Sequence, residues 1–126
     1  MPEFVHGKVS YMQIPASDPE QLGGFYQKVF GWSLRGSGGH VSFSDASDEL
    51  IGAFVTDLQS VGEPGLLPYI SVDDIHQGVA AIEAHGGEMV KRPYREPADA
   101  EDGLWVATFR DPAGNVMGIW SSPPGS

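Results

Sequence analysis

Residues 17–31 read Ser-Asp-Pro-Glu-Gln-Leu-Gly-Gly-Phe-Tyr-Gln-Lys-Val-Phe-Gly and predict the first helix of the protein. Ser17 and Glu20 have the spacing of a capping box, and Pro19 suits the first helical turn. Apolar side chains then recur every three or four residues and form one stripe that a sheet can cover: Leu22, Phe25, Tyr26, Val29 and Phe30. Gly31 provides the C-terminal stop.

Strand-sized segments flank this helix on both sides. Lys8–Ile14 precedes it and ends at Pro15, as expected of a strand that stops at a proline. After the helix, turn residues divide the chain into short apolar pieces. We expect three strands in that region, at 32–36, 40–44 and 50–56.

The second half of the chain repeats this order at an offset of about 55 residues. Ile75, Val79 and Ile82 recur at helical spacing after a cap at Asp73 or Asp74. The other expected elements are a strand at Leu67–Val72, a helix stop at Gly86-Gly87, a strand at 88–91, a polar loop at 93–103, and strands at 104–110 and 116–121 joined by a turn at 111–115.

Two copies of a β-α-β-β-β unit predict an α+β fold. Module one covers about residues 8–57 and module two about 66–121, and residues 58–65 link them. A length of 126 residues is typical of one domain, so we expect both modules to form a single domain over 1–126.

Composition excludes several classes of function. Seven Lys and Arg against seventeen Asp and Glu give a net charge of −10, which repels the phosphates of nucleic acids. The absence of cysteine excludes disulfides, thiolate nucleophiles and cysteine-ligated metals. No apolar stretch approaches the roughly 18 residues of a membrane helix, and the first residues lack the pattern of a signal peptide, so we expect a cytoplasmic location.

Three segments resemble the glyoxalase/bleomycin-resistance proteins of the vicinal oxygen chelate superfamily: Val9–Glu20, Phe25–Trp32 and Phe109–Trp120. The resemblance extends over roughly residues 8–121. It implies paired modules in a curved mixed sheet around a concave cavity, with the helices on the outside, and a homodimer. It also implies that metal-containing relatives hold their ion in the cavity through His, Glu or Gln at four symmetric strand positions.

These four positions match Tyr11, Gly52, Leu67 and Gly118 in this sequence. Leucine and glycine have no donor atoms in their side chains, and a single phenol is a poor site for ions that need three or four donors. Sliding the first strand by two residues brings Gln13 to its position, but no small shift supplies carboxylates or imidazoles at the other three. We therefore expect this fold without a metal and without another cofactor.

Strand alternation extends the candidate ligand site to residues two positions away: Gln13, Phe54, Tyr69 and Trp120. The two glycines would leave room, and aromatic walls with a few polar groups suit a flat, largely apolar organic ligand. Trp105 and Phe43 are further candidates whose facing the sequence leaves open. The alternative is that these rings simply fill the core.

The other titratable residues indicate a site less clearly. The four histidines, His6, His40, His76 and His85, are not spaced as a pair on one face, and His40 alone starts a strand near the expected cavity. Asp99, Glu101 and Asp102, with Glu96 nearby, form an acidic loop. Such a loop is either a solvated surface or a lid that attracts a cationic ligand.

Three functions fit these observations. The first is metal-free binding of a small aromatic compound, as in resistance or sequestration proteins. The second is a metal-dependent lyase, isomerase or dioxygenase, which the fold alone favours. The third is metal-independent catalysis, with Tyr11 as a general acid and Gln13 orienting a carbonyl. We favour the first, with a small molecule and a second copy of the chain as partners and with neither nucleic acid nor membrane.

Overall fold

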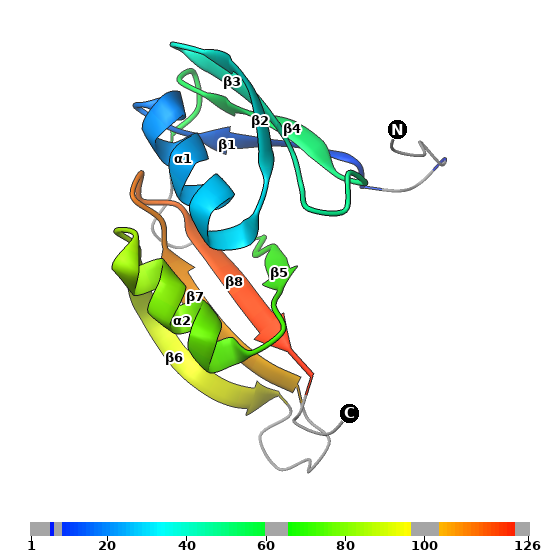
Figure 1. The fold of residues 1–126 in the computed structure, drawn as a ribbon, viewed down its shortest axis with the longest axis vertical. Helices are drawn as coiled ribbons and strands as arrows, with labels where there is room; N and C mark the ends of the chain where they lie inside the picture. Colours follow the sequence, from blue (N-terminus) through cyan, green and yellow to red (C-terminus); the bar gives the residue numbers. More distant parts are fainter. Residues whose placement is uncertain (1–5, 7–8, 60–65, 97–103, 123–126) are drawn as a thin grey trace. The chain divides into compact units, whose positions relative to one another are not determined.

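The computed structural model describes residue 6 and residues 9–59, 66–96 and 104–122. Over these residues it contains two helices and eight strands (Figure 1). The elements are, in order, β1 (Tyr11–Pro15), α1 (Pro19–Phe30), β2 (Ser33–Ser37), β3 (His40–Ser44), β4 (Ile51–Val55), β5 (Tyr69–Ser71), α2 (Ile75–Ala84), β6 (Glu88–Glu96), β7 (Leu104–Arg110) and β8 (Val116–Ser121).

The chain divides into two compact units, Met1–Ser60 and Val61–Ser126, which we call the first and second modules. Each module contains one helix and one four-stranded mixed sheet, in the order β1-β4-β3-β2 in the first and β5-β8-β7-β6 in the second. In both, the outer strand β1 or β5 pairs in parallel with the last strand of its module, and the remaining pairs are antiparallel. The predicted α+β class with two β-α-β-β-β modules is confirmed.

Helix α1 begins one residue later than a capping box on Ser17 requires. The N-cap is Asp18, whose carboxylate accepts a hydrogen bond from the backbone N–H of Gln21 at 3.1 Å. Of the two capping residues that the sequence offers before this helix, Asp18 is therefore confirmed and the capping box on Ser17 is not formed. The predicted stop is confirmed: Gly31 is the C-cap, in the left-handed conformation at φ 75°.

An aromatic cluster forms the core of the first module. The ring of Tyr26 stacks on Trp32 at 4.6 Å and on Phe54 at 5.6 Å between ring centroids. Phe43 completes the cluster, 4.7 Å from Trp32 and 4.9 Å from Phe54. All four side chains are buried. Helix α1 therefore packs one face of the first sheet through stacked rings, which contribute beyond their buried area.

Helix α2 packs on the second sheet through aliphatic side chains. Its N-cap is Asp74, whose carboxylate accepts from the N–H groups of His76 at 2.8 Å and Gln77 at 3.1 Å. The predicted cap is thus confirmed. The buried side chains between helix and sheet are Ile75, Val79 and Ile82 from α2, with Ala107, Phe109, Met117 and Ile119 from the strands.

Two strand boundaries in the second module differ from the sequence prediction. Strand β6 continues to Glu96 and pairs with β7 as far as Leu104, where a polar loop had been expected from residue 93. Two register shifts interrupt that pairing, so the strand lacks the regular alternation by which it could be recognised. Strand β5 is shorter than expected and begins only after Pro68.

Each module closes its last hairpin around an aspartate. In the β3–β4 turn, one carboxylate oxygen of Asp45 accepts from Ser47 Oγ at 2.7 Å and from three backbone N–H groups. In the β7–β8 turn, Asp111 accepts from the N–H groups of Ala113 and Asn115, both at 2.9 Å, and from Nδ2 of Asn115 at 3.0 Å. Asp111 is only 3% exposed. The predicted turn at 111–115 is confirmed.

Within the described part of the chain, neither helix is long and apolar enough to cross a membrane. Asp99, Glu101 and Asp102 of the expected acidic loop lie outside the described residues, and so does most of the expected linker, from 60 to 65.

Candidate functional site: the helix-free faces of the two sheets

Each sheet has one face covered by its own helix and one face turned away from that helix, which we call the helix-free face. Residues paired across neighbouring strands share a face, and successive residues along a strand alternate between faces. The strand register therefore assigns every strand residue to one of the two faces. The assignment is made separately for each module.

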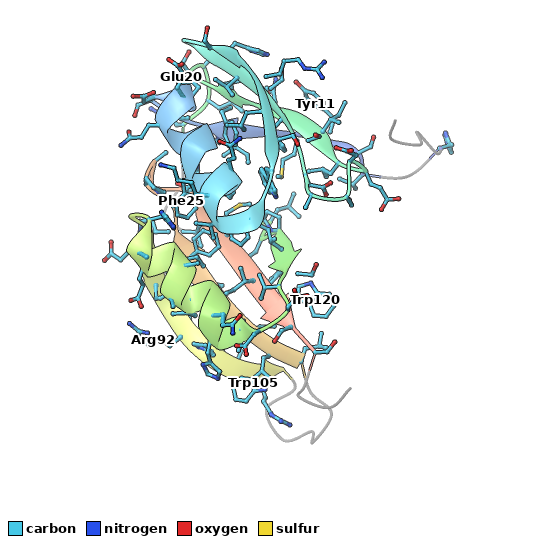
Figure 2. The ribbon with its side chains drawn as sticks, viewed as in Figure 1. Tyr11, Glu20, Phe25, Arg92, Trp105 and Trp120 are labelled. Atoms are coloured by element: carbon cyan, nitrogen blue, oxygen red, sulfur yellow. The ribbon has the colours of Figure 1, made fainter. Side chains whose placement is uncertain are left out.

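On the first sheet the helix-free face is largely polar. Tyr11 stands in register with Ile51 and, through it, with Ser44. The next row along the sheet joins Gln13, Ala53, Ser42 and Arg35. Tyr11 is 54% exposed, and Figure 2 shows it to the right of the first sheet, whereas α1 lies to the left. Tyr11 and Gln13 therefore share a face, as expected from their spacing.

Gly52 and Phe54 lie on the opposite face of this sheet. Gly52 is in register with Met12 and Phe43, and the ring of Phe54 belongs to the buried aromatic cluster. The prediction that both residues share a face with Tyr11 was wrong, because the alignment of β4 was shifted by one residue. A shift of one residue moves every side chain of a strand to the other face of the sheet. When Ala53 rather than Gly52 is aligned with Gly118, the aligned residue of the first module lies on the helix-free face together with Tyr11 and Gln13.

Gly52 therefore leaves no room for a ligand. A Cβ atom added there would overlap the carbonyl oxygen of Met12 and lie 2.5 Å from Cζ of Phe43. The space that a side chain would take is filled by the aromatic core. For Phe43 and Phe54 the alternative stated from the sequence, that the rings fill the core, is confirmed.

On the second sheet the helix-free face carries aromatic rings. Tyr69 is in register with Gly118 and Thr108, and Trp120 stands in the next row with Val106. Tyr69 is 40% exposed and Trp120 is partly buried. Figure 2 shows Trp120 to the right of the second sheet, while α2 lies to the left. The predicted grouping of Tyr69, Gly118 and Trp120 on one face is confirmed.

The ring of Tyr69 lies directly on Gly118. A Cβ atom at Gly118 would overlap Cδ2 and Cε2 of this ring and lie 2.9 Å from Cγ. Beside it, Thr108 is only 7% exposed although it faces away from α2. The glycine thus lets an aromatic ring lie flat against the sheet, next to the largely buried side chain of Thr108.

Trp105 and Leu67 do not join the Tyr69–Trp120 surface through strand pairing. Trp105 is in register with Ser121, on the face of Ala107 and Ile119, and its ring lies 5.9 Å from that of His76 on α2. Trp105 is therefore on the helix side of the second sheet. Leu67 precedes β5 and is partly buried.

The sequence did not indicate several residues of these faces. Thr108 and Val106 follow from the β7–β8 hairpin, because counting back from the turn at 111–115 pairs Arg110 with Val116 and hence Thr108 with Gly118. That count was available from the sequence. Lys91 and Tyr94 of β6 also lie on this face, in register with Thr108 and Val106. Their partners on β7 cannot be found by counting residues along the sequence, because β6 has two register shifts.

The donor set does not fit the metal of the metal-containing relatives. With the corrected register, the positions that match the relatives' metal ligands, together with their neighbours two residues along the strands, hold a phenol, an amide, small or aliphatic side chains and aromatic rings. Among the described residues, no group of three or more His, Asp or Glu side chains is placed to hold a metal ion. Zn²⁺ and similar ions need three or four such donors in fixed geometry. We therefore derive no step through a metal.

A family model described as a glyoxalase-like domain matches residues 11–119 of the chain. The chain therefore belongs to the glyoxalase-like domain family, within the glyoxalase/bleomycin-resistance/dioxygenase superfamily that its sequence resembles. A glyoxylase-like domain-containing protein of Didymella fabae is 28% identical to it over 135 aligned positions, which cover 94% of this chain and 97% of that protein.

Solved structures support the same fold. A glyoxalase/bleomycin resistance protein/dioxygenase family enzyme from Burkholderia phytofirmans PsJN superposes with a TM-score of 0.74 at 21% identity, covering 93% of this chain and all of that one. A glyoxalase/bleomycin resistance protein from Albidiferax ferrireducens T118 gives a TM-score of 0.68 at 19% identity, covering 89% and 97% of the two chains. At these identities the likeness concerns the fold alone.

Proposed function

We propose that this protein binds a small, largely apolar or aromatic organic molecule on the helix-free face of its second sheet, without a metal ion, in the manner of a resistance or sequestration protein. The observation that carries this proposal is the surface formed by Tyr69, Gly118 and Trp120. Two large rings on the side of a sheet away from its helix contribute nothing to the helix–sheet core. Such rings are the usual contact groups for planar ligands.

The arrangement of the rings supports this proposal. The ring of Tyr69 lies flat on Gly118 and makes an apolar floor. Trp120 stands one row further along β8 and is only partly buried, so part of its side chain remains accessible to a ligand. Thr108 supplies a hydroxyl group beside this floor, and one or two such polar groups suffice to orient an apolar ligand.

Catalysis through Tyr11 is a second candidate function. Tyr11 and Gln13 share the helix-free face of the first sheet, so a phenol and an amide are available together. Proton transfer by a phenol near neutral pH requires a cationic neighbour or a similar perturbation. If an identified substrate is turned over, a Tyr11→Phe variant should lose that turnover. Unchanged turnover would exclude this role for Tyr11.

The experiment for the binding proposal compares two tryptophans. Thermal unfolding is first measured against a panel of planar aromatic compounds, because a ligand that binds only the folded state raises the midpoint. Any compound that stabilises the protein is then titrated calorimetrically against Trp120→Phe and Trp105→Phe. Both residues are partly buried tryptophans of the second sheet, but they lie on opposite faces.

We expect Trp120→Phe to weaken binding by about tenfold, since loss of the larger ring of an aromatic contact is worth on the order of 1 kcal/mol. Trp105→Phe should leave the affinity unchanged. The proposal fails if no compound of the panel stabilises the protein, or if Trp105→Phe weakens binding as much as Trp120→Phe.

Metal analysis separates this proposal from a metal-dependent enzyme. The donor set predicts less than one-tenth of an equivalent of transition metal in protein purified without chelators, and no stabilisation by added Zn²⁺, Ni²⁺ or Fe²⁺. One bound ion per chain would contradict this prediction.

We also propose a homodimer as the state in solution, which light scattering during size-exclusion chromatography tests directly.

A further inference from the structure

The cationic side chains of the second sheet are divided between its two faces. Arg92 and Arg95 of β6 lie on the helix side of the sheet. Arg92 forms an ion pair with Glu83 of α2 at 2.9 Å, and Arg95 lies 5.2 Å from the ring centre of Trp105. Lys91 of the same strand is in register with Thr108 and so lies on the helix-free face. Arg110 is on that face as well, in register with Val116.

Neither of the two cations on the helix-free face is neutralised within the described residues. The ammonium group of Lys91 lies 3.8 Å from the ring centre of Tyr94 and forms no ion pair there. Arg110 donates from Nη1 to the carbonyl of Gly114 at 3.4 Å, which occupies one of its five N–H donors. Glu88 stands in register with Arg110, yet the described atoms show no ion pair between them.

The described carboxylates are concentrated elsewhere. Most belong to helix caps, helices and turns: Asp18, Glu20, Asp45, Asp48, Glu49, Asp73, Asp74, Glu83 and Asp111. Two carboxylate residues do belong to this face by register, Glu88 beside Arg110 and Glu96 beside Leu104, at the two ends of β6. Lys91 lies between these ends, in the row of Thr108 and Gly118. A ligand on the face meets the charges nearest to it, since exposed charges beyond about 8 Å are largely screened at physiological salt.

We infer that the ligand is an anion, an aromatic carboxylate whose ring lies on the Tyr69–Trp120 surface and whose carboxylate group is bound by Lys91. This inference rests on the proposed function. Lys91 and Trp120 are two strands and one row apart, about 12 Å between their backbones at the usual strand spacing, and the flexible stem of Lys91 can reach across part of that distance. Thr108 lies between them and can donate a hydrogen bond to the same carboxylate.

Charge-matched probes test this inference. We would titrate 2-naphthoate, 2-naphthylmethylammonium and 2-naphthylmethanol, which share one ring system and differ in charge, into the full-length protein. The carboxylate should bind at least tenfold more tightly than the other two, and its affinity should fall as salt is added. The variants are Lys91→Gln and Arg92→Gln, which each remove one positive charge from neighbouring positions of β6 on opposite faces.

Lys91→Gln should abolish the preference for the carboxylate, and Arg92→Gln should keep it. Both side chains are exposed, and a melting temperature close to that of the unmodified protein confirms that each variant folds. If the ammonium or the alcohol binds as tightly as the carboxylate, or if Lys91→Gln keeps the preference, the inference is wrong and the proposed function stands. If none of the three probes binds, the inference is contradicted, and the thermal-unfolding panel decides the proposed function separately.

Discussion

Gly52 and Gly118 occupy similar places in the last strands of the two modules, but they do opposite things. Gly52 lies on the helix side of its sheet, under the ring of Phe43, and belongs to the core. Gly118 lies on the helix-free face of its sheet, under the ring of Tyr69. The same residue type thus accommodates a structural ring in one module and a ring of the candidate ligand surface in the other.

The two modules differ in the same way over their whole sheets. The first places a cluster of four large rings, those of Tyr26, Trp32, Phe43 and Phe54, between helix and sheet, and its other face carries the exposed ring of Tyr11 with amide and hydroxyl groups. The second builds its core from aliphatic side chains and Phe109 and places Tyr69 and Trp120 on the face away from α2. The largest aromatic cluster therefore supports the core of one module, and we propose that two rings on the helix-free face of the other module bind a ligand.

The largest effect should come from Gly52→Ala. The added methyl group overlaps a backbone carbonyl, that of Met12, which cannot move without breaking the pairing of β1 and β4. We expect a loss of about 3 kcal/mol in the free energy of unfolding, measured by urea denaturation. Phe43→Leu should not rescue this variant, because it leaves the carbonyl in place. A cost below about 1 kcal/mol would contradict the assignment of Gly52 to the core.

The second-largest effect should come from the aspartates that close the two hairpins, whose replacement should lower the free energy of unfolding by different amounts. Asp111→Ala removes the acceptor of three hydrogen bonds, two of them buried, so we expect a loss of about 2–3 kcal/mol. Asp45→Ala removes a similar set of bonds at a more exposed turn, where water replaces the carboxylate, and should cost about 1 kcal/mol. Equal costs in urea denaturation would show that burial does not distinguish the two turns.

Gly118→Ala should cost less than Gly52→Ala. The nearest atoms to the added methyl group all belong to the side chain of Tyr69, which is partly exposed and can rotate away. We expect a loss of about 1 kcal/mol, most of which should disappear when Gly118→Ala is measured in a Tyr69→Ala background. Purely additive losses in this double-mutant cycle would contradict the direct contact between ring and glycine.

The helix caps should give the smallest effects. Asp74 accepts two backbone hydrogen bonds at the start of α2, and Asp18 accepts one at the start of α1. Replacement of either by Ala should cost up to about 1 kcal/mol, with the larger loss for Asp74→Ala. The opposite order in chemical denaturation would show that hydrogen-bond number does not decide the strength of these caps.

Much of the fold could be predicted from the sequence because it rests on local signals. The apolar stripe of α1, the stop at Gly31 and the turn at 111–115 each depend on residues close together in the chain. Strand β6 was predicted too short, because its register shifts and exposed polar residues hide the strand pattern. Local patterns find elements well when the alternation is regular, and poorly at irregular edge strands.

The candidate site was harder to predict because it depends on pairing between distant strands. No turn fixes the register of β1 against β4, so Gly52 was placed on the wrong face by one residue. In the second module, the grouping of Tyr69, Gly118 and Trp120 was correct. The misplacement of Gly52 does not change the argument about metal donors, since the side chain of Ala53, like that of Gly52, has no donor atom.

The central claim, that the Tyr69–Trp120 surface binds an aromatic ligand, is tested most directly by the three indole N–H signals in an NMR titration with 2-naphthoate. Variants of single tryptophans assign these signals to Trp32, Trp105 and Trp120. We predict that the signal of Trp120 shifts in a saturable manner, while those of Trp32, in the buried core, and Trp105, on the helix side, remain in place. A saturable shift at Trp105 or Trp32 with none at Trp120 would contradict the account.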